Sequence, residues 1–219
     1  MCTFARMRST TPLSLNSILT ALDLDTACLP LLAEAPGHDT LLHAHTPDAI
    51  YAAIRDIGHT LQVEAKANQL ADDLEERINI VSHKLKFISD ENKPRVLFLA
   101  DVAPIRLVDN AYLAAIARVA GGIPVSTPTE GAVIDTLVII SEKPVQQLLA
   151  ALPNWLAMPE WAETEAVKQG NIYLIHHPDH LQQPGALVAD DIEILAEIFY
   201  PKQFIFGRDE DAWMKFEGQ

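Results

Sequence analysis

The chain has 219 residues, 49% of them hydrophobic, with 9 Gly and 14 Pro. This composition is typical of a globular protein and excludes a disordered or fibrous chain. Asp and Glu number 30 against 16 Lys and Arg, which gives a formal net charge of -14. So acidic a surface repels phosphate backbones and anionic lipids, and we therefore expect neither nucleic acid nor a membrane surface as a partner.

The first 12 residues carry Arg6 and Arg8 but no apolar stretch of the roughly 7–15 residues that a secretory signal needs. No segment approaches the roughly 20 apolar residues of a membrane span. From the residues alone we expect a soluble chain without a visible signal peptide. Cys2 and Cys28 provide neither a disulfide framework nor a zinc spacing.

The first 45 residues give only short, alternating signals. Residues 14–19 predict a helical turn with Ser14 as its N-cap. Residues 26–29 and 40–42 are predicted as short strands on either side of a turn at Pro36 and Gly37.

The strongest pattern begins at Thr46, a predicted N-cap, with Pro47 in the first helical position. Apolar residues then recur in steps of three and four, which place one stripe along one face of a helix. The stripe comprises Ala67, Leu70, Leu74, Ile78, Val81, Leu85 and Ile88. We expect one helix over residues 47–88, weakest at Gly58, that reaches roughly 60 Å and joins two lobes. A coiled coil would give the same stripe, but normally over more heptads.

After a polar boundary at residues 89–94, predicted strands and helices alternate. The strands are apolar on both faces, as in a parallel sheet covered on both sides; they span residues 95–99, 136–140 and 171–175. The helices span residues 110–120, 145–151 and 186–200, the first of them ending at Gly121 and Gly122. This order predicts a three-layer α/β lobe.

No GxSxG, P-loop, GxGxxG or HExxH motif occurs. We therefore expect a protein that is not an enzyme and that has no catalytic residue and no bound cofactor. Trp155 and Trp161 allow two interpretations, an aromatic clamp or packing of a Pro-rich loop on the sheet, and Tyr112 fits core or cleft equally well.

Histidines are the most suggestive side chains. They gather in two places: His43 and His45, and the group His176, His177 and His180 with Asp179. The second group follows the third predicted strand, and α/β sheets bind their ligands at the carboxyl ends of parallel strands. Three interpretations stay open, namely a solvated loop, a zinc site or part of an organic-ligand site.

Four stretches, in their order and spacing, resemble the class III (long-helix) periplasmic solute-binding proteins of ABC transporters for cobalamin, siderophores and haem. They are residues 46–50 with 54–58, residues 94–99 with 119–122, Trp161 with residues 166–167 and 170–173, and residues 183–185 with 192–198, Pro201 and Phe204. The resemblance implies a three-layer αβα lobe over residues 94–219. A long helix within residues 46–93 joins it to a reduced, truncated amino-terminal lobe in residues 1–45.

The resemblance also implies a function. The chain would bind cobalamin (vitamin B12), another corrinoid or a similar metal chelate such as haem or a ferric siderophore, and deliver it to an ABC permease. A periplasmic or otherwise extracytoplasmic location follows from the same likeness. The alternative is a non-transport interaction subunit that has lost the ligand cleft, and a homodimer through the reduced lobe is a further expectation.

The floor of the ligand cleft follows from the resemblance as well, with no metal ligand among its residues. It would consist of Asp101, Val102, Ile105, Arg106, Tyr112, His177, His180 and Gln182. Arg106 would pair with an anionic or carboxamide edge of the ligand, and His177 or His180 would donate hydrogen bonds or approach a metal centre.

Overall fold

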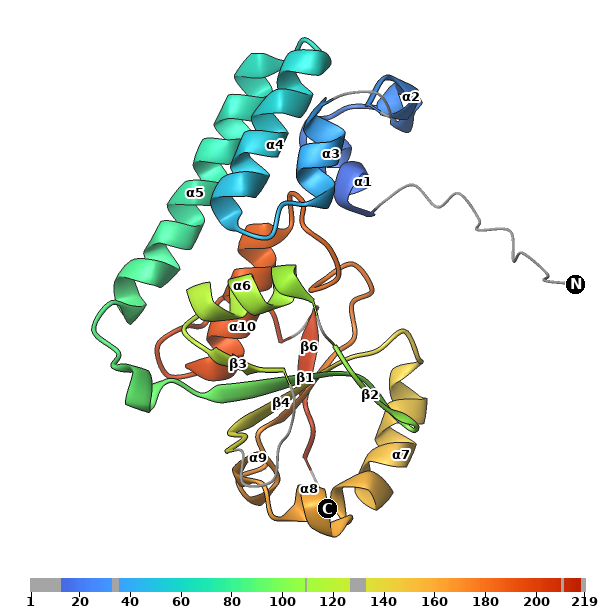
Figure 1. The fold of residues 1–219 in the computed structure, drawn as a ribbon, viewed down its shortest axis with the longest axis vertical. Helices are drawn as coiled ribbons and strands as arrows, with labels where there is room; N and C mark the ends of the chain where they lie inside the picture. The colour runs from blue at the N-terminus through green and yellow to red at the C-terminus, as the bar shows by residue number, and fades with distance from the viewer. Residues whose placement is uncertain (1–12, 33–35, 109, 127–132, 210, 218–219) are drawn as a thin grey trace, which may run out of the picture.

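The computed structural model describes residues 13–32, 36–108, 110–126, 133–209 and 211–217. Helices α1 to α5 form the amino-terminal part, and a sheet with helices on both faces forms the rest (Figure 1). This arrangement confirms the predicted α/β class and the αβα carboxyl-terminal lobe.

The sheet has the strand order β2-β1-β4-β5-β6, with β3 paired to β1 beside β2. Its central strands are parallel: β1 (Arg95–Val102), β4 (Thr136–Ile140) and β5 (Ile172–Ile175). Three short strands complete it: β2 (Ile105–Leu107), β3 (Ile123–Val125) and β6 (Trp213–Lys215). The prediction found the three central strands because they are buried on both faces, and it missed the short ones, which have three residues each.

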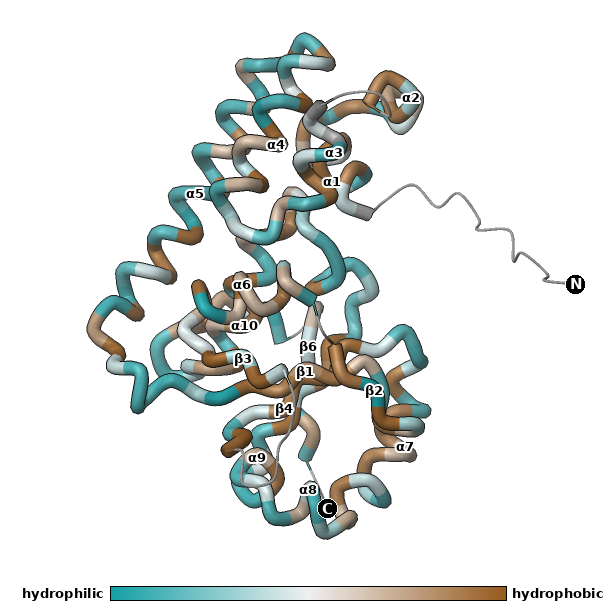
Figure 2. The backbone as a smooth tube through the Cα atoms, viewed as in Figure 1, coloured by the Kyte–Doolittle hydropathy of each residue, from teal (hydrophilic) through white to brown (hydrophobic). Residues whose placement is uncertain are grey.

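Successive residues of the central strands face different cores. Val96 and Phe98 of β1 belong to one apolar cluster, and Leu97 and Leu99 belong to the other. Helices α6 (Ala111–Val119) and α10 (Val188–Phe199) cover the first face, and α7 (Val145–Leu156), α8 (Pro159–Ala162) and α9 (Glu165–Lys168) cover the second (Figure 1). In Figure 2 strands β1 and β4 are accordingly coloured largely as hydrophobic.

The amino-terminal segments are helical. They are α1 (Leu13–Ala21), the 3-10 turn η1 (Thr26–Cys28), α2 (Leu29–Leu32) and α3 (Pro36–Leu42). The strands predicted over residues 26–29 and 40–42 are therefore wrong. The carboxylate of Asp25 accepts a hydrogen bond from the N–H of Ala27 at 2.7 Å and starts the turn η1, and residues 40–42 form the last turn of α3. Ser14 lies inside α1 rather than at its N-cap.

The single helix expected over residues 47–88 is also wrong. The span forms two helices, α4 (Pro47–Thr60) and α5 (Glu64–Leu85), which pack against each other as a hairpin (Figure 1). Helix α5 alone runs on to the α/β lobe, and its 22 residues correspond to about 33 Å. It is followed by the turn η2 (Asp90–Asn92). A helix therefore does connect the two parts of the molecule, but it is about half as long as expected.

The break between α4 and α5 has a local cause. Gln62 adopts a φ of 57°, the left-handed conformation in which a helix commonly ends. The N–H of Val63 donates to the carbonyl of Gly58 at 2.8 Å, the six-to-one bond of a Schellman motif. Glycine usually occupies the left-handed position at the end of a helix. Because a glutamine occupies it here, the sequence gives no clear indication that a helix ends at this point.

The helices and the α/β lobe share one apolar core. Ile54 of α4, Leu74 of α5, Ile116 of α6 and Ile194 of α10 are all buried in the same cluster, which continues to one face of the sheet. The predicted division into an amino-terminal lobe, a connecting helix and a carboxyl-terminal lobe, with boundaries at residues 45 and 93, therefore stays a prediction. Within the residues that the structure describes, no helix combines the length and the apolarity that crossing a membrane requires.

Candidate functional site

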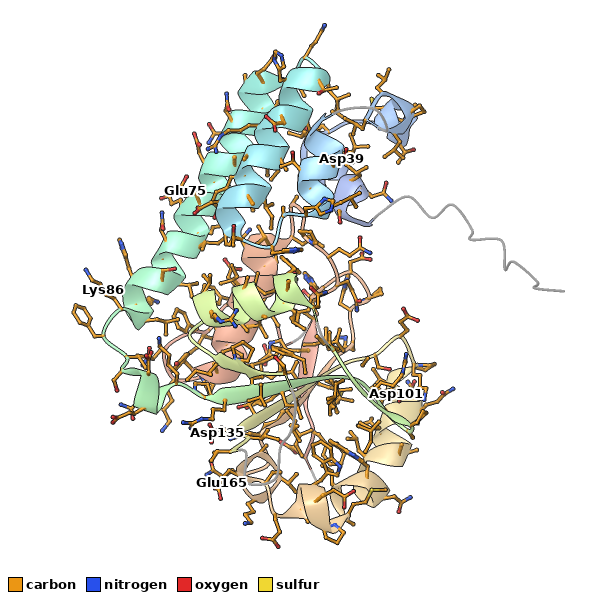
Figure 3. All side chains as sticks on the ribbon, in the orientation of Figure 1. Asp39, Glu75, Lys86, Asp101, Asp135 and Glu165 are labelled. Carbon is orange, nitrogen blue, oxygen red and sulfur yellow. The ribbon has the colours of Figure 1, made fainter. Side chains whose placement is uncertain are left out.

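The central strands end at one edge of the sheet, and the loops that follow them form the candidate site. These loops are the turn between β1 and β2, residues 141–144 between β4 and α7, and residues 176–187 between β5 and α10. Figure 3 labels Asp101 at this edge, close to β2 and α7. In open α/β sheets this edge is the usual place for a ligand.

Two adjoining cavities open here. The larger, which we call the carboxyl-edge cavity, has a volume of about 470 Å³. It is lined by Ser141, Glu142, Lys143, Pro144, Val145, Ile175, His176, His177, Pro178, Gln182 and Gln183. The smaller, the minor cavity, has a volume of about 170 Å³ and shares Glu142 and Gln182 with the larger. Its other lining residues are Ala100, Arg106, Val108, Asn110, Ile140 and Leu181.

Asp101 is buried at the end of β1, with a side chain only 3% exposed. Lys143 Nζ lies 2.5 Å from its Oδ2, and the N–H groups of Val102 and Ala103 donate to its Oδ1. Burial alone would raise the pKa of Asp101, but the hydrogen bonds from Lys143, Ala103 and Val102 outweigh it and hold the pKa below its ordinary value. The role of Asp101 in the structure is therefore to anchor Lys143 at the cavity wall.

This pairing predicts a pH-dependent effect of Asp101→Asn. A depressed carboxyl pKa stabilises the fold above the ordinary pKa of about 3.9, and the contribution disappears as pH falls through the lower, folded-state value. We expect the variant to unfold about 1–3 kcal/mol more easily near pH 7. The stability difference from the parent protein should shrink below about pH 4. Denaturant unfolding from pH 3 to 7 measures it, with Asp90→Asn, an exposed carboxylate paired with Lys93, as the control that shows a smaller difference.

Arg106 and Gln182 meet at the minor cavity. The pairing of β1 with β2 sets Arg106 opposite Asp101, with Arg106 Nη2 at 3.7 Å from Oδ2. Because its side chain is 60% exposed, the guanidinium keeps donors free for a ligand. Asn110, which caps α6 through its Oδ1, donates from Nδ2 to the carbonyl of Gln182 at 3.4 Å and links the loop 176–187 to that helix.

The two predicted histidines lie side by side, with ring centroids 4.9 Å apart. His177 lines the carboxyl-edge cavity, and its Nδ1 accepts a hydrogen bond from the N–H of Asp179. Its Nε2 therefore carries the proton in the neutral ring and acts as a donor. His180 turns away to Asp191, 2.9 Å from Nδ1. Across the described ranges, no group of three or more His, Cys, Asp or Glu side chains is placed to hold a metal ion.

Other predicted residues lie in the core. Tyr112 is 1% exposed and donates its hydroxyl hydrogen to Asp191 at 2.7 Å, and Val102 is 4% exposed. Both are therefore placed beneath the cleft rather than at its surface. Trp155 and Trp161 pack together in the second core at 4.6 Å, which supports the packing interpretation over an aromatic clamp. Ile105, by contrast, is exposed on β2.

Sequence reasoning missed the loop after β4. Ser141, Glu142 and Lys143 line the carboxyl-edge cavity, as do His176 and Gln183 from the neighbouring loop. The signal was available, because residues 136–140 were predicted as a buried strand and a ligand loop is expected at its carboxyl end.

A third cavity, the interlobe cavity, has a volume of about 470 Å³ and lies between α1, α5 and the start of α10. Gln183 lines both this cavity and the carboxyl-edge cavity. Its walls combine hydroxyls of α1, such as Ser17 and Thr20, with Leu74 and Arg77 of α5. The loop 176–187 thus separates two sizeable cavities.

The architecture of the chain thus combines a parallel α/β lobe, a helix that carries a second unit, and cavities at the carboxyl edge of the sheet. Solved structures match it. The chain aligns with an ABC transporter substrate-binding protein from Listeria monocytogenes EGD-e over 72% of its length, at 18% identity and a TM-score of 0.60. It aligns with the TroA-like periplasmic binding protein FepB from Veillonella parvula over 80%, at 18% identity and 0.62.

A third match is IsdE of S. aureus, solved in complex with heme, over 71% of this chain at 17% identity and a TM-score of 0.59. The chain covers 66%, 63% and 66% of these three structures, respectively. No protein-family model matches the sequence, and neither does any curated protein. The chain therefore has the fold of the TroA-like, class III binding proteins, which confirms the predicted resemblance at the level of the fold.

Proposed function

We propose that this chain binds a metal chelate of the haem, ferric siderophore or corrinoid kind and presents it to an ABC permease, without catalysing a reaction. The observation that carries the proposal is the pair of adjoining cavities at the carboxyl edge of a TroA-like fold. The volume of the larger one, about 470 Å³, falls within the usual range for small-molecule sites, about 300–1,000 Å³.

The chemistry of the walls supports a large ligand with polar edges. Val145, Ile175 and the prolines at positions 144 and 178 supply apolar surface in the carboxyl-edge cavity. Lys143 and His177 supply hydrogen-bond donors, and Arg106 adds a guanidinium in the minor cavity. An apolar surface with a few converging donors suits a macrocycle that carries carboxylates or carboxamides around its rim.

The rigidity of the scaffold points the same way. Helix α5 packs on α4 and α10, and Arg77 of α5 binds Asp190 and Glu193 of α10 at 2.6–2.9 Å. Two units held by one helix and by ion pairs hinge little, so the interlobe cavity next to the carboxyl-edge cavity is largely formed before binding. A preformed cleft suits a rigid ligand because little ordering cost remains at binding.

Titration with haemin, cyanocobalamin, dicyanocobinamide and a ferric hydroxamate siderophore tests the proposal. We expect at least one of them to change tryptophan fluorescence saturably and to raise the melting temperature, since a ligand that binds only the native state stabilises it by mass action. Arg106→Ala should weaken the binding by roughly tenfold, the effect of about 1.4 kcal/mol. Arg118→Ala, on the exposed end of α6, is the matched control and should leave the affinity unchanged.

No response to any of the four chelates, at concentrations well above micromolar, would contradict the proposal. It would favour the alternative, an interaction subunit. Size-exclusion chromatography with light scattering then tests that alternative through the predicted homodimer. An extracytoplasmic location and a permease partner belong to the same proposal, because the chain spans only about two thirds of the binding proteins that it matches.

A further inference from the structure

The loop 176–187 lines every cavity described above. It contributes His177 to the carboxyl-edge cavity, Leu181 to the minor cavity and Asp179 to the interlobe cavity. The backbone conformation of this one loop therefore affects the shape of all three cavities.

One buried side chain holds the loop from below. Asp191 lies in the first turn of α10 and is 0% exposed. Its Oδ1 accepts from the backbone N–H of Leu181 at 3.0 Å and lies 2.9 Å from Nδ1 of His180. Its Oδ2 accepts from the hydroxyl of Tyr112 at 2.7 Å. The carboxylate thus ties the loop, α10 and α6 together at a single point.

The loop needs such an anchor at Leu181. This residue has a φ of 61°, a left-handed conformation that a branched apolar side chain rarely adopts. The conformation turns the side chain into the core, where it is 1% exposed. The bond from its N–H to Asp191 is the contact that fixes this backbone.

The neighbouring carboxylates of α10 have other partners. Asp190 and Glu193 pair with Arg77 and Arg208. Asp191 instead faces only His180, Tyr112 and the N–H of Leu181 among its described hydrogen-bond partners. The adjacent residues Asp190 and Asp191 therefore bind different parts of the molecule, and variants of the two can be compared in one experiment.

We propose that Asp191 is the positioning residue of the ligand site: as a carboxylate it fixes the left-handed Leu181 and holds His180 with its proton on Nδ1. The ring of His177, which lies against that of His180 at a centroid distance of 4.9 Å, is thereby held at the cavity wall. Asp191 is buried and acts on the ligand only through this loop. The effect on affinity rests on the proposed function, while the effect on the loop does not.

Hydrogen exchange measured by mass spectrometry on the ligand-free protein tests the anchor. In Asp191→Ala we expect amides in residues 176–183 to exchange at least tenfold faster, with α10 still protected. Asp190→Ala, one position away, should leave this loop at the parent rate. An unchanged exchange rate of the loop in Asp191→Ala, or an equal acceleration of loop exchange in both variants, would overturn the proposal.

Two milder variants keep the test decisive if Asp191→Ala does not fold. Asp191→Asn and Tyr112→Phe should each accelerate exchange in the loop by a smaller factor. The side-chain ¹⁵N shifts of His180, assigned with His180→Gln, should show Nδ1 protonated in the parent protein. In Asp191→Asn the tautomer population should move toward Nε2. Parent-like shifts and exchange in both variants would contradict the anchor.

A final experiment tests whether the contacts of Asp191 affect the affinity for a ligand. For whichever of haemin, cyanocobalamin, dicyanocobinamide or ferric hydroxamate binds the parent protein, Asp191→Asn should weaken the affinity at least tenfold. Asp135→Asn, at the opposite edge of the sheet, should leave the affinity unchanged. If none of them binds, the proposed function fails while the exchange and NMR results still decide the role of Asp191. If the loop loosens without any loss of affinity, the positioning role is excluded.

Discussion

Gly58→Ala is expected to destabilise the protein, although the same exchange stabilises most helices. A Cβ at position 58 would lie 2.1 Å from the Cβ of Ala67, far inside contact distance, so α4 and α5 would have to separate. Overpacking of this severity costs about 3 kcal/mol. The helix propensity of alanine returns only about 1 kcal/mol. We expect a net loss of roughly 2 kcal/mol in the free energy of unfolding, measured by urea denaturation.

The double variant Gly58→Ala/Ala67→Gly is the matched control. It moves the methyl group from one helix to the other, so the close approach is restored and most of the lost stability should return. A Gly58→Ala protein as stable as the parent would show that the hairpin is not packed as closely as this structure has it.

Arg77→Ala is expected to have the second large effect. The guanidinium of Arg77 bonds to both oxygens of Glu193 and to Asp190, and these carboxyl side chains are only 8% and 17% exposed. Burial lowers the pKa of Arg77, but the hydrogen bonds to Glu193 and Asp190 outweigh it and raise the pKa above its ordinary value. Removal leaves Arg208 alone against the buried Glu193 and the partly buried Asp190.

We expect Arg77→Ala to cost about 2–3 kcal/mol, somewhat less than the 3–5 kcal/mol typical of a fully buried pair, because Arg77 is 36% exposed. Arg55→Ala is the control: Arg55 also pairs with an acid, Asp72, at 2.8 Å, but Asp72 is 65% exposed. Such surface pairs contribute about 0–1 kcal/mol. Equal losses in both variants would show that the contacts between α5 and α10 do not stabilise the protein beyond a surface pair.

The sequence predicted the α/β lobe well because its signals are local. Strands β1, β4 and β5 are continuous apolar runs, and α6 ends where Gly121 adopts a positive φ of 83°. The hairpin of α4 and α5 could not be predicted in the same way. Its turn depends on a glutamine in a left-handed conformation and on the contact between Gly58 and Ala67, which joins residues on different helices.

The candidate site was predictable only in part. Its expected position followed from the carboxyl ends of parallel strands, and His177 and Gln182 line a cavity there. That these residues bind a ligand stays a prediction. The burial of Tyr112 and the turn of His180 toward Asp191 depend on how α6 and α10 pack, and no pattern of single residues encodes that packing.

Hydrogen exchange can locate a bound chelate directly, by comparing the free protein with the protein saturated by haemin or by whichever of the four chelates binds. We expect protection of residues 141–145 and 176–183, the two segments that line the carboxyl-edge cavity. Protection confined to helices α1 to α4 or to the second core around α8, with these segments unchanged, would place the ligand elsewhere and contradict this expectation.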